Sequence, residues 1–155
     1  MKISFYEEFP TKENLNKIKL INFNSGLIVA AKSLKEFYLI ENEVKKYKNK
    51  NIKETIYWPV LEKEEGYWFS AFSKNSALKR TIDELKQNRN SLTVMWDAEL
   101  PVQKSLILRE ILSYFRNRKM ILDFFKNAEK YKIKILTSEY PLESKILRNI
   151  LFDFF

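Results

Sequence analysis

Short apolar runs alternate with longer amphipathic segments along this chain, and this alternation constrains the fold more than any other feature of the sequence. The apolar runs at residues 2–6, 26–31, 55–60, 92–96 and 132–136 predict strands. Helical spacing predicts helices at 12–20, 34–47, 76–87, 102–131 and 142–151, with the fourth broken into two at residues 116–118. Strands that alternate with helices indicate a parallel sheet with right-handed crossovers.

The fold class is therefore α/β, and residues 1–155 are expected to form one domain. The chain has only two glycines and four prolines, which leaves few tight turns and argues against an all-β fold. Five strand–helix units fall short of the eight that close a barrel. We therefore expect a half or incomplete TIM-barrel-like sheet.

The composition excludes several kinds of chemistry. With no cysteine, the chain cannot hold an iron–sulfur cluster or use a thiol nucleophile, and with no histidine it lacks the usual ligands of zinc and haem. A Ser-His-Asp triad is excluded for the same reason. The two glycines form no phosphate-binding loop, so a P-loop and a dinucleotide-binding fingerprint are excluded as well.

The net charge is +8, which favours nucleic acid, phosphorylated ligands or anionic lipid as partners. Lysine supplies 22 of the 28 basic residues, however, and a genome rich in A and T gives this bias whatever the function. No stretch is long and apolar enough for a membrane span. The first residues lack the apolar core of a signal peptide, so a cytoplasmic location without a membrane is expected.

Every proline lies at the end of a predicted strand or within five residues after it, and three of the four end a phrase made of an acid, an apolar residue and proline. These phrases are Glu-Glu-Phe-Pro at 7–10, Glu-Leu-Pro at 99–101 and Glu-Tyr-Pro at 139–141. One interpretation is structural, because proline and acids both suit the first turn of a helix. The other is functional, because the carboxyl ends of parallel strands form the ligand site of such folds.

On the functional interpretation, carboxylates converge at this edge of the sheet. Glu7 (or its neighbour Glu8), Glu99 and Glu139 are the candidate catalytic acids and bases, and Asp97 and Glu99 are the candidate ligands for Mg²⁺ or Mn²⁺. The candidate substrate-binding residues are Lys32, as an anion contact, and Tyr6, Trp58 and Trp96, as aromatic walls. Each aromatic residue also fits an ordinary place in the core.

The segment 61–73 interrupts the alternation with a charged tip and four aromatic residues. Long loops at this edge often cover a site. We expect a short extra strand here in preference to a mobile lid.

A cluster of basic residues in the predicted fourth helical region suggests an alternative function. Arg116, Arg118 and Lys119 are flanked by aromatic residues, a pattern that suits RNA, and the run 45–53 is also basic. The same residues fit the solvated face of an amphipathic helix. The apolar stretch 146–155 either folds back to cap a self-contained open sheet or forms an interface, in a homo-oligomer or with a second chain that completes a barrel.

Four phrases carry a family resemblance: Tyr-Glu-Glu-Phe-Pro, Tyr-Trp-Pro, Gly-Tyr-Trp-Phe-Ser and Asp-Ala-Glu-Leu-Pro. Together they resemble the N-terminal half of an uncharacterised archaeal family of barrel-like proteins, over most of residues 1–141. The resemblance implies a barrel and no reaction. The chain departs from phosphodiesterase barrels in lacking their histidines.

The sequence thus predicts a protein that binds a sugar-like or phosphorylated small molecule, or a metal-dependent enzyme subunit, with an acidic site at the strand ends. The alternative is a basic RNA-binding module or a non-catalytic subunit of a larger assembly.

Overall fold

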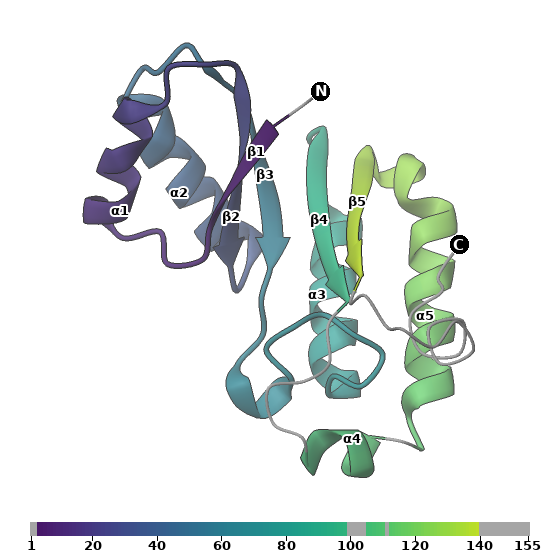
Figure 1. The fold of residues 1–155 in the computed structure, drawn as a ribbon. Helices are drawn as coiled ribbons and strands as arrows, with labels where there is room; N and C mark the ends of the chain where they lie inside the picture. Colours follow the sequence, from purple (N-terminus) through teal and green to yellow (C-terminus); the bar gives the residue numbers. More distant parts are fainter. Residues whose placement is uncertain (1–2, 99–104, 111, 140–155) are drawn as a thin grey trace.

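Five parallel strands form a single sheet in sequence order (Figure 1). The computed structural model describes residues 3–98, 105–110 and 112–139. The strands are β1 (Ile3–Glu7), β2 (Ser25–Ala31), β3 (Ile52–Pro59), β4 (Leu92–Ala98) and β5 (Ile133–Glu139). Within the described residues β1 pairs only with β2, and β5 only with β4, so the sheet is open and the expected half-barrel-like α/β fold is confirmed.

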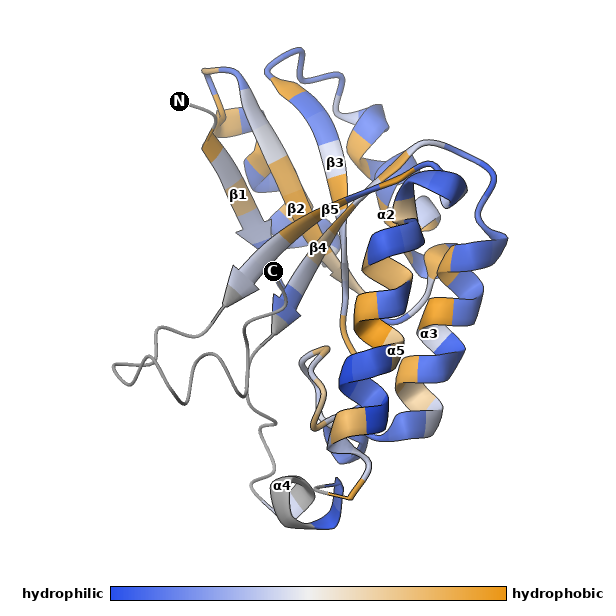
Figure 2. Ribbon diagram, turned by 90° about the vertical axis from the view of Figure 1, so that its right-hand side faces the viewer, coloured by the Kyte–Doolittle hydropathy of each residue, from blue (hydrophilic) through white to orange (hydrophobic). Residues whose placement is uncertain are grey.

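The long helices lie on one face of this sheet, as Figure 2 shows for α2, α3 and α5. The helical elements are α1 (Lys12–Asn16), η1 (Lys17–Leu20), α2 (Leu34–Lys46), η2 (Lys63–Glu65), α3 (Asn75–Gln87), α4 (Ser105–Glu110), α5 (Tyr114–Asn127) and η3 (Ala128–Tyr131). Each strand is followed in the sheet by the next strand of the sequence, and the connection between two such parallel strands is right-handed. Because the strand order runs in one direction, right-handed connections place all the connecting helices on the same face. No helix among the described residues is long and apolar enough to cross a membrane.

The helix break expected at residues 116–118 is wrong. Helix α5 runs through these residues, and the preceding helix α4 ends at Glu110. Asn117, in the middle of the expected break, is fully buried and donates hydrogen bonds to the carbonyls of Ala71 and Ser73, at 2.9 and 3.0 Å. It anchors α5 to a distant loop. The helix expected at 142–151 lies outside the described residues.

The core has two parts, one on each face of the sheet. The larger part lies between the sheet and its helices and contains Tyr57, Val94 and Trp96. The smaller part contains Ile28, Trp58 and other residues of alternate strand positions. Successive side chains of a strand point to opposite faces, so neighbours such as Tyr57 and Trp58 belong to different clusters. We call the second face the open face, because no described helix packs on it (Figure 2).

Strands β1 and β2 approach closely at Gly26. A Cβ atom at this position would lie 2.7 Å from the Ser4 hydroxyl oxygen and 3.4 Å from a methyl group of Ile56. A larger residue at position 26 would therefore require the Ser4 hydroxyl to rotate away.

Candidate functional site

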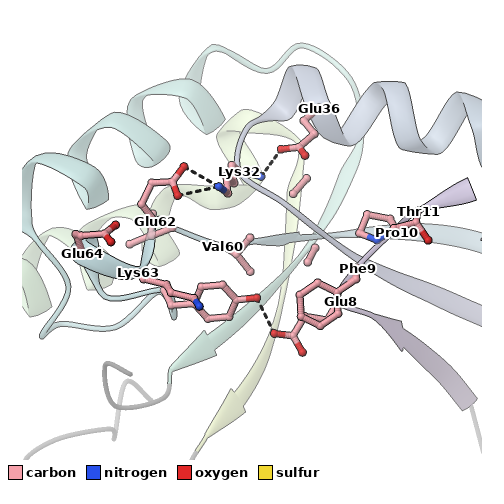
Figure 3. A pocket seen from close by; sticks show the side chains of 14 residues that line it. Glu8, Phe9, Pro10, Thr11, Lys32, Glu36, Val60, Glu62, Lys63 and Glu64 are labelled. Carbon is pink, nitrogen blue, oxygen red and sulfur yellow. Dashed lines mark hydrogen bonds and ion pairs between the residues drawn. The ribbon is translucent and has the colours of Figure 1, made fainter. Parts of the chain in front are cut away.

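A cleft of about 540 Å³ opens at the carboxyl ends of β1, β2 and β3 (Figure 3). Its lining comes from three segments that follow these strands. They are Glu8, Phe9, Pro10 and Thr11 after β1; Ala30, Ala31, Lys32 and Glu36 around the end of β2; and Val60, Leu61, Glu62, Lys63, Glu64 and Tyr67 after β3. Pockets for small ligands usually measure about 300–1,000 Å³, so the cleft is large enough for a small molecule.

The turn after β1 places Glu8 at the cleft. The Glu7 carboxylate accepts a hydrogen bond from the Phe9 backbone N–H at 2.9 Å, and the Asn14 amide donates to the Phe9 carbonyl at 2.9 Å. Thr11 then caps α1 by accepting from the Asn14 N–H. The contacts of Glu7 therefore hold the turn, and it is Glu8 that lines the cleft.

The start of α2 fixes Lys32. Ser33 caps the helix by accepting from the Glu36 N–H, as its spacing predicted. The Glu36 carboxylate accepts at 2.7 Å from the N–H of Lys32 and not from that of Ser33. The turn thus holds the backbone of Lys32 while its side chain extends along the cleft (Figure 3).

Lys32 forms an ion pair with Glu62 across the cleft. The Lys32 Nζ lies 2.7 and 2.8 Å from the two carboxylate oxygens of Glu62, and both side chains are 54% exposed. The bond to Glu62 is the main reason that the pKa of the Lys32 ammonium is raised, and the charges of Glu36 and Glu64 add to it. Lys32 is therefore a cation whose charge is already matched.

A second ion pair holds the turn that carries Glu62. Glu62 and Glu65 form a capping box around η2, in which each side chain accepts from the other's backbone N–H. Arg80 on α3 donates to both oxygens of Glu65, at 3.0 and 2.8 Å. The Arg80 guanidinium lowers the pKa of Glu65. The position of Glu62 is thus tied to a helix outside the cleft.

Tyr67 links this turn to the end of β1. Its hydroxyl donates to the Glu8 carboxylate at 2.6 Å, and its φ of +62° is in the left-handed region. Burial, followed by the bond to Glu8, raises the pKa of the Tyr67 phenol. Tyr67 is therefore a hydrogen-bond donor at neutral pH.

The segment 61–73 contains one turn of 3-10 helix, η2, and no strand, so the expected extra strand is wrong. Its backbone is held by Ser73, whose hydroxyl donates to the Trp68 carbonyl at 2.7 Å, and by the Asn117 amide. These polar contacts take the place of strand pairing.

The other predicted site residues divide between the two faces of the sheet. Tyr6 is 53% exposed on the open face and packs edge-on against Trp58, with the two ring centroids 5.6 Å apart. Trp58 is buried because Trp68 stacks on it, also at 5.6 Å. Burial, and then the nearby charge of Asp97, raises the pKa of Tyr6. Tyr6, Trp58 and Asp97 thus lie near one another, beside the cleft and not in its lining.

Trp96 is fully buried on the helix-facing side, against Phe69 and Phe125. Trp96 is not part of the cleft lining and has the ordinary place in the core that the sequence also allowed. Glu7, whose bonds hold its own turn, is likewise absent from the cleft lining.

The remaining predicted catalytic acids are Glu99 and Glu139. Glu99 lies outside the described residues, and Glu139 is the last residue of β5, in register with Ala98. Among the described residues, no group of three or more carboxylates lies close enough together to hold a metal ion. The metal site at Asp97 and Glu99 therefore stays a prediction.

The predicted basic cluster is divided. Arg116 and Lys119 line a groove of about 370 Å³ between α3 and α5 that also contains Lys86. Arg118 is not part of this lining, and its charge acts on Tyr114. Helical spacing explains the division, because residues two apart lie on different sides of a helix.

Sequence reasoning missed Glu62 and Tyr67 as parts of the site. The pattern Glu62-Lys63-Glu64-Glu65 carries only part of the signal of a capped turn, because Glu65 fits the last position of a capping box but Glu62 stands where serine or threonine is usual. Nothing local indicates that Tyr67 reaches Glu8, which lies 59 residues away in the sequence.

Comparisons with family models, with curated proteins and with solved structures gave no match to this chain.

Proposed function

We propose that this chain binds a sugar-like or phosphorylated small molecule in the cleft after β1, β2 and β3, either as a binding protein or as a subunit of an enzyme. The observation that carries the proposal is the meeting of polar groups from three strand ends in one cavity. Ligand sites of parallel α/β folds form at this edge.

The chemistry of the lining supports such a ligand. Carboxylates at Glu8 and Glu62 can accept hydrogen bonds from hydroxyl groups, and Lys32 and Tyr67 can donate them. Phe9 is 62% exposed and offers an apolar surface for the carbon face of a sugar ring. These are the kinds of groups that orient a small polar molecule in a pocket.

Nuclear magnetic resonance titration with pentoses, hexoses and their phosphates tests the proposal. At least one compound is expected to give saturable shifts confined to the cleft residues. Glu8→Gln should weaken that binding about tenfold, because a bond to a charged acceptor is lost. Glu13→Gln is the matched control, since Glu13 is an exposed acid of α1 outside the cleft lining. Shifts that are absent from the cleft for every compound would contradict the proposal.

The divalent cation predicted from the sequence is tested in the same way with Mn²⁺, which broadens the resonances of nearby nuclei. Selective broadening around Asp97 would support a metal site there. Broadening spread evenly over the acidic surface residues would contradict it.

The groove between α3 and α5 supports a second candidate, RNA binding. Lys86, Arg116 and Lys119 share the lining of this groove with the partly buried ring of Tyr131, although the acid Asp123 also belongs to it. If RNA binds there, replacing Arg116 and Lys119 by alanine should reduce the salt dependence of binding by about two counterions. Lys17→Ala with Lys19→Ala removes the same charge elsewhere and should change the salt dependence less. Equal effects of the two double variants would contradict a specific groove.

A further inference from the structure

The cleft has a cation that an anionic ligand would need, but this cation already has an anionic partner. Both oxygens of Glu62 lie within hydrogen-bond distance of the Lys32 Nζ. The other lysine of the lining, Lys63, belongs to the same turn as Glu62. An incoming phosphate would therefore compete for Lys32 with a carboxylate that is part of the protein.

Glu62 is held in this position from behind. Its backbone N–H and its carboxylate both take part in the capping box with Glu65. The Arg80 guanidinium in turn donates a hydrogen bond to each carboxylate oxygen of Glu65. Neither Arg80 nor Glu65 lines the cleft. Arg80 and Glu65 therefore help to fix the turn that carries Glu62 from outside the cleft lining.

We infer that Glu62 determines the specificity of the cleft, because it occupies the anion position at Lys32 and so favours an uncharged polyhydroxylated ligand over a phosphorylated one. This inference rests on the proposed function and selects between the two ligand classes named there.

The electrostatics of the lining agree with this selection. A phosphate placed at the Lys32 Nζ would lie beside the Glu62 carboxylate and near those of Glu36 and Glu64, and like charges at such distances repel. A sugar hydroxyl meets no such penalty, because it can donate to Glu62 and accept from Lys32 at the same time. The ion pair is exposed, so a ligand can reach both groups.

Inorganic phosphate is the probe that tests the inference. Its binding is followed through the chemical shifts of the Lys32 side chain, at constant ionic strength, in the unchanged protein and in Glu62→Gln. Glutamine keeps the size of the side chain and removes its charge. The unchanged protein is expected to show no saturable shift at Lys32, and Glu62→Gln is expected to bind phosphate at least about tenfold more tightly.

Glu64→Gln is the matched control, because it removes the same charge from the same turn and Glu64 makes no bond to Lys32 in the structure. Saturable phosphate binding at Lys32 in the unchanged protein would overturn the inference. So would a gain in Glu62→Gln no larger than that in Glu64→Gln.

The two proposals can fail separately. If no sugar shifts the cleft resonances but Glu62→Gln gains phosphate binding, the proposed function is wrong and the role of Glu62 at Lys32 stands. If a sugar phosphate binds the unchanged protein more tightly than the parent sugar, the proposed function stands and the role of Glu62 is wrong.

Discussion

Trp58 and Trp96 are tryptophans of neighbouring strands, yet they belong to different parts of the molecule. Trp96 is fully buried between the sheet and the helices, with aromatic rings around it. Trp58 lies on the open face in a smaller apolar cluster, where Trp68 stacks on its ring and Tyr6 packs edge-on against it. The helix-facing side is a closed core, and the open side with its adjoining cleft is held by fewer contacts.

This difference separates stability from ligand binding. Closed apolar packing contributes most of the free energy of folding, whereas exposed ion pairs contribute little. Lys32, Glu62 and Arg80 belong to the second kind, with side chains about half exposed. Substitutions of these residues should therefore change the free energy of unfolding little, so the ligand preference of the cleft can change while the fold is kept.

Replacing the two tryptophans by alanine tests this separation most severely. Trp96→Ala should lower the free energy of unfolding by about 3–5 kcal/mol, because it leaves a cavity in a closed core. Trp58→Ala should cost about half as much, since the Trp68 loop can move into the space. Urea unfolding followed by circular dichroism measures both. Equal costs, or a larger cost at Trp58, would break the comparison.

Asn117 tests whether a polar residue can belong to the closed side. Asn117→Ala leaves the carbonyls of Ala71 and Ser73 without their buried donor and should cost about 2–3 kcal/mol. Asn127→Ala is the control on the same helix, because the Asn127 side chain bonds only to near neighbours in sequence: it donates to the carbonyl of Asp123 and accepts from the ammonium group of Lys130, and both bonds are exposed. Thermal and urea unfolding compare the two variants, and similar losses would place Asn117 outside the closed core.

The pair of Arg80 and Glu65 tests the open side and should have the smallest effect. Since Arg80 lowers the pKa of Glu65 in the folded protein below its ordinary value of 4.5, the stabilisation is present above that pH and is lost as the pH falls through the folded pKa. Arg80→Leu should therefore cost about 0.5–1 kcal/mol near neutral pH and almost nothing in strong acid. Urea unfolding at both pH values measures this difference. A cost that does not change with pH would show that Arg80 acts through packing.

Local patterns were sufficient to predict the order of strands and helices. The apolar run 26–31 matches β2 to within one residue, and the Ser33 cap begins α2 where it was expected. The α/β class follows from the alternation of such segments. Asn117 shows the limit of local patterns, because its partners lie 44 and 46 residues away and nothing near it in the sequence indicates burial.

The site was predicted less well, because it depends on which way a side chain points. The strand edge, Lys32 and a carboxylate from Glu7 or Glu8 were expected, and of these two acids Glu8 lines the cleft. A shift of one residue reverses the face on which a strand side chain lies. The same rule separates Trp58 from Trp96. Glu62 and Tyr67 come from a loop whose course is set by tertiary hydrogen bonds.

The close approach at Gly26 makes two positions behave as one in any change of sequence. Because the Ser4 hydroxyl occupies the space that a side chain at position 26 would need, alanine at 26 requires that the hydroxyl move or be removed. The side chains at positions 4 and 26 of the paired strands β1 and β2 compete for the same space. Variants selected from a library should therefore combine a larger residue at 26 with glycine or a reoriented small residue at 4.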